Sequence, residues 1–331
     1  MLGKNFEAEI REQPAVWRRI AHSSHARELA NAVSEREVVL VGSGSSLFVA
    51  MLAALALRRR GVRAAALAAT EAGFERGAYR GRTVVALSQS GRSADVLRAV
   101  EVLEPERLVA LTNDAGAPLA LRADVVIDVD AGIELAVPAT KSVTAMVAVA
   151  LWAAGLVSGS SERGSATLER TASDVEAWLS GAGGAEITRV AERIARRSSV
   201  AVVGAGYGVP IALELALKFK EASYVHAEGF AAGEFRHGSA AILDASTTLV
   251  GVVDDASRSI VERPLEEAGR TESLRFTIGG AVAGVPRLGA ETGEAFNTLA
   301  WLVAGQLLAL EIGRARGVDG DAPRGLSKFV G

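Results

Sequence analysis

Short apolar runs that alternate with segments able to form helices restrict the fold of this chain more than any other feature. In the first half they lie at residues 38–41, 64–68, 83–87, 108–112 and 125–129. Alternating strands and helices favour a parallel sheet that is covered by helices on both faces. The sequence therefore predicts an α/β fold, in which ligands bind beyond the carboxyl ends of the strands.

The same pattern returns in the second half of the chain. Residues 200–208 (VAVVGAGYG) echo residues 38–46, residues 248–253 echo residues 83–88, and residues 294–316 echo the helix expected after Thr140. This duplication indicates two tandem doubly wound parallel sheets. We place the boundary in the serine- and glycine-rich residues 158–165, which gives domains at 1–160 and 161–316 and a tail at 317–331. Residues 5–33 predict an amphipathic helix or a pair of helices that precedes the first strand.

Composition narrows the class of protein. The chain has 331 residues, enough for two domains, and 49% of them are hydrophobic, which is typical of a globular protein. The net charge of -3 argues against a nucleic-acid partner. No apolar run reaches the roughly 18 residues of a membrane span, and no basic leader opens the chain, so we expect no membrane partner and a cytoplasmic location. The absence of cysteine excludes disulfides, thiolate zinc sites and a cysteine nucleophile.

Two loops at strand ends are candidate anion sites. Residues 42–46 (GSGSS) offer backbone N–H groups and the hydroxyls of Ser43 and Ser45, although a plain linker turn would have the same composition. The third glycine and the acidic residue of a dinucleotide site are not where that motif needs them.

Residues 88–93 (SQSGRS) combine three hydroxyls and an amide with a predicted helix start, which suits phosphate; the alternative is that these serines only cap the helix. The second repeat has Asp254 and Asp255 at the equivalent place. We therefore expect one phosphate site per chain.

Residues 213–238 (LELALKFKEASYVHAEGFAAGEFRHG) contain most of the remaining side chains that could act in catalysis. Glu214, Lys218 and Glu221 share one face of a predicted helix, which either faces a cavity or is a solvated ion pair. The following residues predict a tight loop, and convergence of its side chains with the helix would suit proton transfer. The loop side chains concerned are His226, Glu228, Glu234 and His237. His22 and His25 are expected at the surface.

Four stretches together resemble the sugar isomerase (SIS) family of phosphosugar proteins, in particular the isomerase half of glucosamine-6-phosphate synthases. They are ALKFKEASYVHAEGFAAGEFRHG, LSQSGRSAD, GIELAVPATK at 132–141 and VDGDAPRGLSK in the tail. The resemblance implies tandem flavodoxin-like domains that form a homodimer, with no metal and no cofactor.

The resemblance also implies a role for each matching residue. Glu221 would move a proton between C1 and C2 of the open-chain sugar, supported by Lys218 and Glu214, and His237 would assist ring opening and reach the neighbouring subunit's site. Lys328 would condense with the sugar as a Schiff base, which requires a neutral amine and hence burial under a closed tail. The implied substrate contacts are Ser43, Ser45, Ser88, Gln89, Ser90, Ser93, Val137, Ala139, Thr140 and Ser327.

Two departures from the family pattern bear on the substrate, because Ala139 and Gly44 stand where relatives have serine. The resemblance implies an enzyme for an amino-sugar or ketose phosphate. Since no glutaminase half is evident in the sequence, we expect a glucosamine-6-phosphate deaminase with isomerisation. The alternatives are a fructosamine-6-phosphate deglycase, a plain aldose-ketose isomerase, a synthase fed with ammonia from elsewhere, and a non-catalytic sugar-phosphate sensor.

Overall fold

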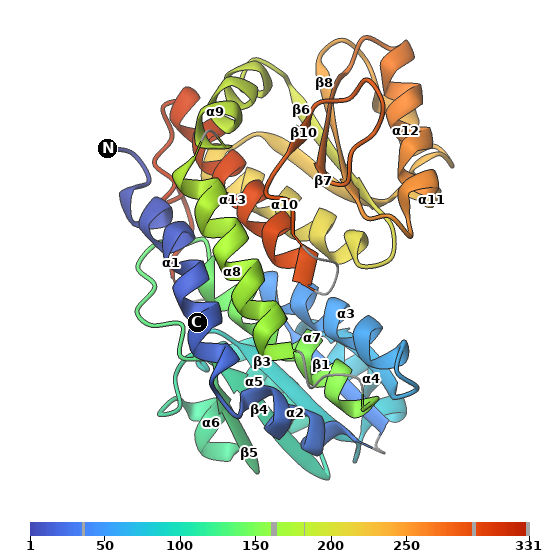
Figure 1. Cartoon of the computed structure of the whole chain (residues 1–331). Helices are drawn as coiled ribbons and strands as arrows, with labels where there is room; N and C mark the ends of the chain where they lie inside the picture. Colours follow the sequence, from blue (N-terminus) through green and yellow to red (C-terminus); the bar gives the residue numbers. More distant parts are fainter. Residues whose placement is uncertain (35–36, 160–163, 182, 293–295, 329–331) are drawn as a thin grey trace. The chain divides into compact units, whose positions relative to one another are not determined.

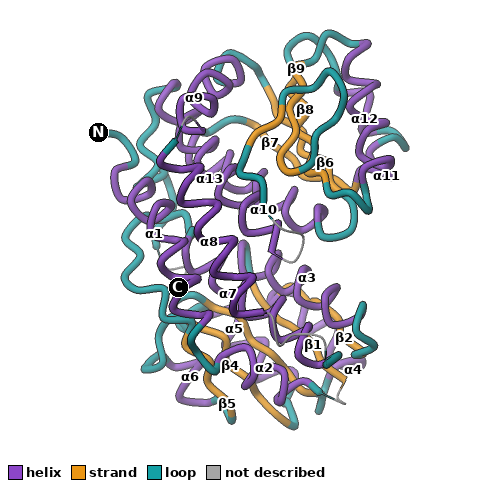
Figure 2. The backbone as a smooth tube through the Cα atoms, in the orientation of Figure 1, coloured by secondary structure: helices purple, strands orange, loops and turns teal. Residues whose placement is uncertain are grey.

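The computed structural model describes the chain except for residues 35–36, 160–163, 182, 293–295 and 329–331 (Figures 1 and 2). The chain divides into two compact units, each containing one five-stranded sheet. The first-sheet unit comprises Glu12–Glu134, Ala139–Ala172 and Ser327–Gly331, and the second-sheet unit comprises Met1–Arg11, Leu135–Pro138 and Ser173–Leu326. The boundary proposed between residues 160 and 161 lies outside the described residues. Among the described helices, none combines the length and the apolar character that a membrane crossing needs.

The first sheet has the strand order β2-β1-β3-β4-β5, and all of its strand pairs are parallel. Its strands are β1 (Glu37–Gly42), β2 (Arg63–Ala68), β3 (Thr83–Ser88), β4 (Arg107–Thr112) and β5 (Val125–Asp128). Each overlaps one of the five apolar runs, so these predictions are confirmed. The connecting segments are α3 (Ser45–Arg58), η1 (Ala69–Glu71), α4 (Ala72–Tyr79), α5 (Ala94–Leu103) and α6 (Pro118–Arg122), and α7 (Lys141–Val157) follows the last strand.

The core of the first sheet explains why its strands are apolar on both faces. All six residues of β3 are buried. Successive side chains of a strand point to opposite faces, so both faces of β3 must be covered. On one face, Val39 and Val84 belong to the same buried cluster as Val96 and Leu103 of α5.

The second sheet repeats this architecture. Its order is β7-β6-β8-β9-β10, again with parallel pairing throughout. The strands are β6 (Ser199–Gly204), β7 (His226–Ala231), β8 (Thr247–Val253), β9 (Leu274–Gly279) and β10 (Arg287–Leu288). The helices are α9 (Gly183–Ile194), α10 (Gly208–Ser223), α11 (Ala232–Phe235), η2 (Ser239–Ile242), α12 (Arg258–Arg270) and α13 (Asn297–Ala315).

Both sheets have the 2-1-3-4-5 order of flavodoxin-like folds when their strands are numbered within each repeat. The predicted duplication of a doubly wound α/β unit is therefore confirmed. In each repeat, the loops after the first and third strands emerge at the same edge, because those strands are neighbours and run parallel. This edge is where such sheets bind ligands.

A glycine at the end of the first strand of each repeat lets the next helix begin at once. A Cβ on Gly42 would lie 2.6 Å from the carbonyl carbon of Ser46, and a Cβ on Gly204 would lie 2.1 Å from the carbonyl oxygen of Gly208. Neither backbone atom can move aside without displacing the helix. The two positions thus keep the loop short in both repeats.

Three further helices complete the described chain. α1 (Lys4–Ala21) and α2 (His25–Val33) form the pair predicted for residues 5–33, and α8 (Gly164–Ser180) follows α7. α1 and α8 each contribute residues to both units.

The prediction of a tight loop after α10 is wrong for residues 226–231, which form strand β7. Among the described strands it pairs only with β6 and so lies at the edge of its sheet. Ala227 is buried while His226 and Glu228 are exposed, which is the alternation of a strand with one covered face. The charged side chains that suggested a loop are typical of edge strands.

The tail is docked on the amino terminus of α1 within the second-sheet unit. The N–H of Gly3 donates to the carboxylate of Asp319 (2.8 Å), and the N–H groups of Asn5 and Phe6 donate to that of Asp321 (3.0 and 2.7 Å). Helix starts have unpaired N–H groups and a partial positive charge, and a carboxylate satisfies both. Residues 319–321 are therefore ordered by a helix cap and are not a frayed end.

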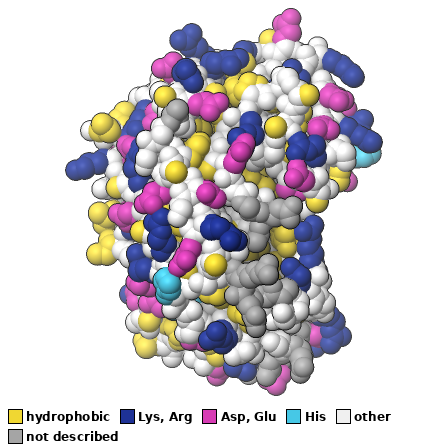
Figure 3. Space-filling view, in the orientation of Figure 1, with side chains coloured by type: hydrophobic (Ala, Val, Ile, Leu, Met, Phe, Trp, Pro, Cys, Tyr) yellow, Lys and Arg dark blue, Asp and Glu magenta, His cyan; other side chains and the backbone are white. Residues whose placement is uncertain are grey.

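Charged side chains of both signs are interspersed on the face shown in Figure 3. His22 follows the surface expectation, since its side chain is 73% exposed and lies 2.9 Å from Glu169. The mixture of charges agrees with the small net charge of the chain.

Candidate functional site

A buried ion-pair cluster lies on α10 in the second-sheet unit. The ammonium of Lys218 lies 2.5 Å from a carboxylate oxygen of Glu221 and 3.5 Å from one of Glu214. The side chains of Lys218 and Glu214 are 1% and 2% exposed. The interpretation as a solvated helix pair is therefore wrong. A buried ammonium is stable only with such partners, because removing it from water unpaired costs several kcal/mol.

Glu221 differs from the other two in its access to solvent. The Glu221 side chain is 16% exposed, and the ammonium of Lys218 donates to one of its carboxylate oxygens. The helix ends at Ser223, and the capping residue Tyr224 after it has a left-handed backbone (φ 55°). A carboxylate fixed by a buried cation and still reachable is chemically suited to general-base work.

The structure does not bring the predicted loop side chains into this cluster. His226 and Glu228 lie 3.5 Å apart as an exposed pair on β7, with side chains 70% and 52% exposed. Glu234 and His237 are exposed on and just after α11. A role for His237 in a neighbouring subunit stays a prediction.

The serine loop after β3 has a defined geometry in the first-sheet unit. The hydroxyl oxygen of Ser88 accepts the N–H of Gly91 (3.1 Å), and that of Ser90 accepts the N–H of Arg92 (3.1 Å). Both oxygens act as acceptors, so their O–H groups are directed away from these N–H groups. Ser93 precedes α5 without a side-chain capping bond. The hydroxyls of Ser88 and Ser90 therefore stabilise the loop, and that of Ser93 does not cap α5.

Gly91 makes this loop possible. Its φ is 61°, and a Cβ there would lie 2.5 Å from that of Ala117. The N–H of Asn113, the residue after β4, donates to the carbonyl of Gln89 (3.1 Å) and fixes the loop to the neighbouring strand.

The glycine-serine loop after β1 lies at the same sheet edge. The hydroxyl of Ser43 is buried and has no hydrogen-bond partner among the described residues, and Ser45 is the first residue of α3. Gly44 has φ 55° and ψ -129°, a conformation that residues with a side chain adopt only with strain. Glycine at position 44 suits this backbone conformation.

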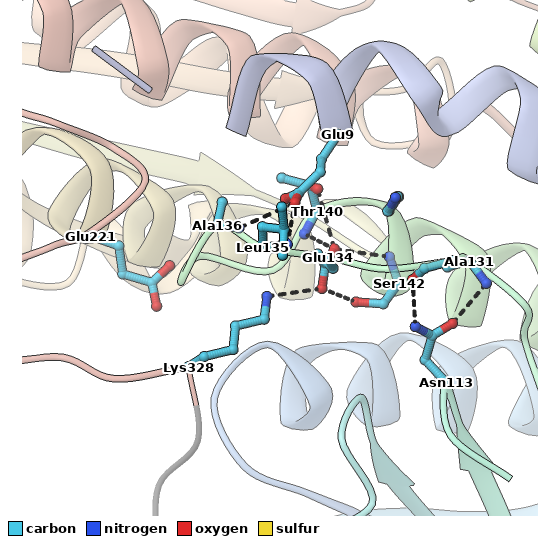
Figure 4. Close-up of polar contacts among 12 residues, drawn as sticks. Glu9, Asn113, Ala131, Glu134, Leu135, Ala136, Thr140, Ser142, Glu221 and Lys328 are labelled. Carbon is cyan, nitrogen blue, oxygen red and sulfur yellow. Dashed lines mark hydrogen bonds and ion pairs between the residues drawn. The ribbon is translucent and has the colours of Figure 1, made fainter. Parts of the chain in front are cut away.

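The loop after β5 is held by Asn113. Its side-chain oxygen accepts the N–H of Ala131 (2.7 Å), and its amide donates to the carbonyl of Gly132 (2.9 Å) (Figure 4). Sequence reasoning missed this residue; its only signal was its position directly after a buried strand.

Glu134 is the centre of this part of the site. Its carboxylate accepts the N–H (2.8 Å) and hydroxyl (3.3 Å) of Thr140 and the hydroxyl of Ser142 (2.8 Å), and its side chain is fully buried. Thr140, a predicted substrate contact, is 0% exposed and is used here to hold the carboxylate. The other predicted contacts of this loop, Val137 and Ala139, are half-buried.

Lys328 approaches the same carboxylate. Its ammonium lies 3.3 Å from Glu134, and its side chain is 16% exposed (Figure 4). Ser327, before it, is exposed. Burial raises the pKa of Glu134, while the charge of Lys328 and the bonds from Thr140 and Ser142 lower it, and the net pKa lies below its ordinary 4.5. Glu134 is therefore ionised at neutral pH.

Among the described residues, no group of three or more His, Asp or Glu side chains is placed to hold a metal ion. The donor set that the structure presents consists of hydroxyls, backbone N–H groups, lysines and carboxylates. In the first-sheet unit these groups can bind an oxyanion and form an imine, and in the second-sheet unit the Glu221 carboxylate can move a proton.

Replacing Glu134 by glutamine is expected to lower the free energy of unfolding at pH 7 by about 1–3 kcal/mol, because bonds to a buried charge are lost. A carboxylate whose folded pKa is lowered stabilises the fold above its ordinary pKa and loses this effect as pH falls through the lowered value. The gap between variant and parent should therefore shrink below pH 4.5, measured by urea titration. The exposed Glu228→Gln is the control, expected within about 0.5 kcal/mol. A gap equally large at pH 3.5 and pH 7 would contradict this account.

Known proteins match the chain over most of its length. The SIS domain family model matches residues 33–155 and 193–263. The glutamine–fructose-6-phosphate aminotransferase (isomerizing) of Sulfolobus acidocaldarius is 30% identical over 318 residues, covering 91% of this chain and 51% of the relative. That of Aquifex aeolicus is 35% identical over 263 residues, covering 75% of this chain and 43% of the relative. The chain thus spans about half the length of these curated relatives or less.

Solved structures agree with the fold. The C-terminal domain of glucosamine-fructose-6-phosphate aminotransferase from Francisella tularensis superposes with a TM-score of 0.83 at 24% identity, covering 96% of this chain and 98% of that one. A glucosamine-6-phosphate deaminase from Thermotoga maritima gives 0.79 at 21% identity, covering 99% of both chains. Because the family model matches more than half of the residues, the chain belongs to the SIS domain family.

Proposed function

We propose that the chain is a phosphosugar enzyme that converts glucosamine 6-phosphate and water to fructose 6-phosphate and ammonia. The observation that carries this proposal is the pairing of the Lys328 amine with the buried, ionised carboxylate of Glu134. Imine formation needs the free amine, so the Lys328 ammonium must first lose a proton, and the adjacent carboxylate is a group that can take it.

The resemblance to the family assigns each step to a group of this chain. Glu221 takes the proton from C2 of the open-chain amino sugar and returns one to C1, which leaves an imine at C2. The nitrogen of Lys328 attacks C2, ammonia departs, and the sugar stays on the lysine as an imine. One water then hydrolyses this bond and releases fructose 6-phosphate. Lys218 holds the Glu221 carboxylate in place for the first step through their 2.5 Å contact.

The phosphate is assigned to the serine loop after β3, together with the hydroxyls of the loop after β1. Ser43 supports this assignment, because a buried hydroxyl without a partner in the described chain favours a ligand at that edge. Binding by hydroxyls and helix N–H groups needs no lysine.

The direction of the reaction separates this proposal from its alternatives. The 331 residues contain no cysteine, so they offer no thiolate to cleave glutamine. The Thermotoga maritima protein, matched over 99% of its length, is named as a glucosamine-6-phosphate deaminase. The curated relatives, in contrast, are named as aminotransferases, which favours synthesis as the second candidate. A non-catalytic sensor is less favoured because Glu221, His237 and Lys328 are all present.

The first prediction of this proposal concerns the reaction itself. The purified chain should release ammonia and fructose 6-phosphate in equal amounts from glucosamine 6-phosphate, without metal or nucleotide, in a coupled ammonia assay. Fructosamine 6-phosphates and glutamine with fructose 6-phosphate are the comparison substrates. Release of an amino acid from the former would support a deglycase, and formation of glutamate from the latter would support a synthase; either result without hexosamine turnover overturns the proposal.

The second prediction separates the base from the imine-forming lysine. Glu221→Gln should lose about 10²–10⁴ in turnover and in solvent-deuterium exchange at the reacting carbon. It should still be trapped on fructose 6-phosphate by borohydride, whereas Lys328→Ala should not. The exposed Lys220→Ala should behave like the parent. Peptide mapping that finds the trapped sugar on another lysine would refute the assignment.

The third prediction concerns the phosphate loop. Ser88→Ala and Ser90→Ala should each raise KM about tenfold or more with a smaller effect on kcat, because a hydroxyl bond to a charged group is lost. Ser259→Ala, on the exposed start of α12, is the matched control from the second repeat. If both loop variants keep the parental KM, the phosphate lies elsewhere.

A further inference from the structure

A pocket of about 290 Å³ lies at the carboxyl edge of the second sheet, beyond the ends of β8 and β9. Its polar lining includes Asp254, Asp255, Arg287, Glu291, Asn297 and Trp301. All of these residues belong to the second-sheet unit. Its volume is near the lower end of the range for small-molecule sites. We call it the β8–β9 pocket.

The β8–β9 pocket occupies the place in the second repeat that the serine loop occupies in the first. β8 is the third strand of its repeat, as β3 is in the first, and each lies beside the first strand of its own sheet. Asp254 and Asp255 follow β8 where Gln89 and Ser90 follow β3. The duplication therefore provides a second ligand edge with different chemistry.

Trp301 is directed into this pocket from α13. The residue is 5% exposed, and a Cβ on the pocket-lining Gly279 would lie 2.5 Å from its indole nitrogen. Within the described part of the chain, that N–H makes no hydrogen bond. The indole therefore presents a donor to the pocket, which an acceptor oxygen of a ligand can use.

The charges of the lining indicate which ligand fits. Three carboxylates and one guanidinium line the pocket. The guanidinium of Arg287 is engaged by Glu291 at 2.8 Å, and Asp255 is paired with Arg258. Asp254 accepts the N–H of Ser257 through one oxygen (2.7 Å) and brings its charge to the wall. A phosphorylated ligand would be repelled, whereas an ammonium or a hydroxyl would find an acceptor.

We propose that the β8–β9 pocket is a second binding site, which takes an unphosphorylated amino sugar: a cationic polyol whose ammonium and hydroxyls bind Asp254 and Asn297 and whose ring or hydroxyl oxygen accepts the N–H of Trp301. This site is separate from the proposed reaction and does not depend on it.

Fluorine NMR of the full chain labelled with 5-fluorotryptophan tests the site. The chain has four tryptophans, and the resonance that disappears in Trp301→Phe identifies the reporter. Titration with glucosamine should shift this resonance to saturation, glucose should require about tenfold more ligand, and glucosamine 6-phosphate should act more weakly than glucosamine. A reporter that no probe moves, or that inorganic phosphate or methylammonium moves equally, overturns the proposal.

Charge variants check that the shift comes from the pocket. Asp254→Asn should weaken the glucosamine response about tenfold, and Asp174→Asn, on the exposed face of α8, should leave it unchanged. If Asp254→Asn does not fold, the exposed Glu291→Gln replaces it and should weaken the response about threefold. Equal responses in the parent and in both pocket variants contradict the assignment.

Discussion

The carboxylate of Glu134 is the constraint on which the first-sheet unit depends. A buried charge is tolerated only when it is fully hydrogen-bonded and paired, and Glu134 meets this condition with donors from the start of α7 and with Lys328. One carboxylate consequently fixes the start of α7, the loop before it and Lys328 of the tail. A ligand that binds the Lys328 amine must break its ion pair with Glu134. Ligand binding is therefore coupled to the order of the loop that Glu134 holds.

Much of the fold was predictable because its strands are buried on both faces and read as continuous apolar runs. The predictions of the two repeats and of the ion-pair face of α10 followed from periodicity alone. The prediction failed at β7, since an edge strand with His226 and Glu228 exposed has the composition of a loop. The contacts of Glu134 were not predictable, because Lys328 lies 194 residues away in the chain and is placed by the tail. Asn113 was missed for a similar reason, since its bonds reach residues 131 and 132.

The two repeats show how one architecture supports different recognition. Their strand order and their glycine at the first strand end are the same, yet one edge presents serine hydroxyls and the other presents carboxylates and an indole. Topology therefore fixes where a ligand can bind, and the few residues after the third strand decide its charge.

The cap on α1 links the beginning of the chain to residues made some 315 positions later. Domains generally fold during synthesis, starting from the amino terminus. The first turn of α1 cannot follow that order, since Asp319 and Asp321, which supply its acceptors, are made some 315 residues later. Until then its N–H groups must be satisfied by water or by another anion. Residues 3–6 thus reach their final state only once residues 319–321 are in place.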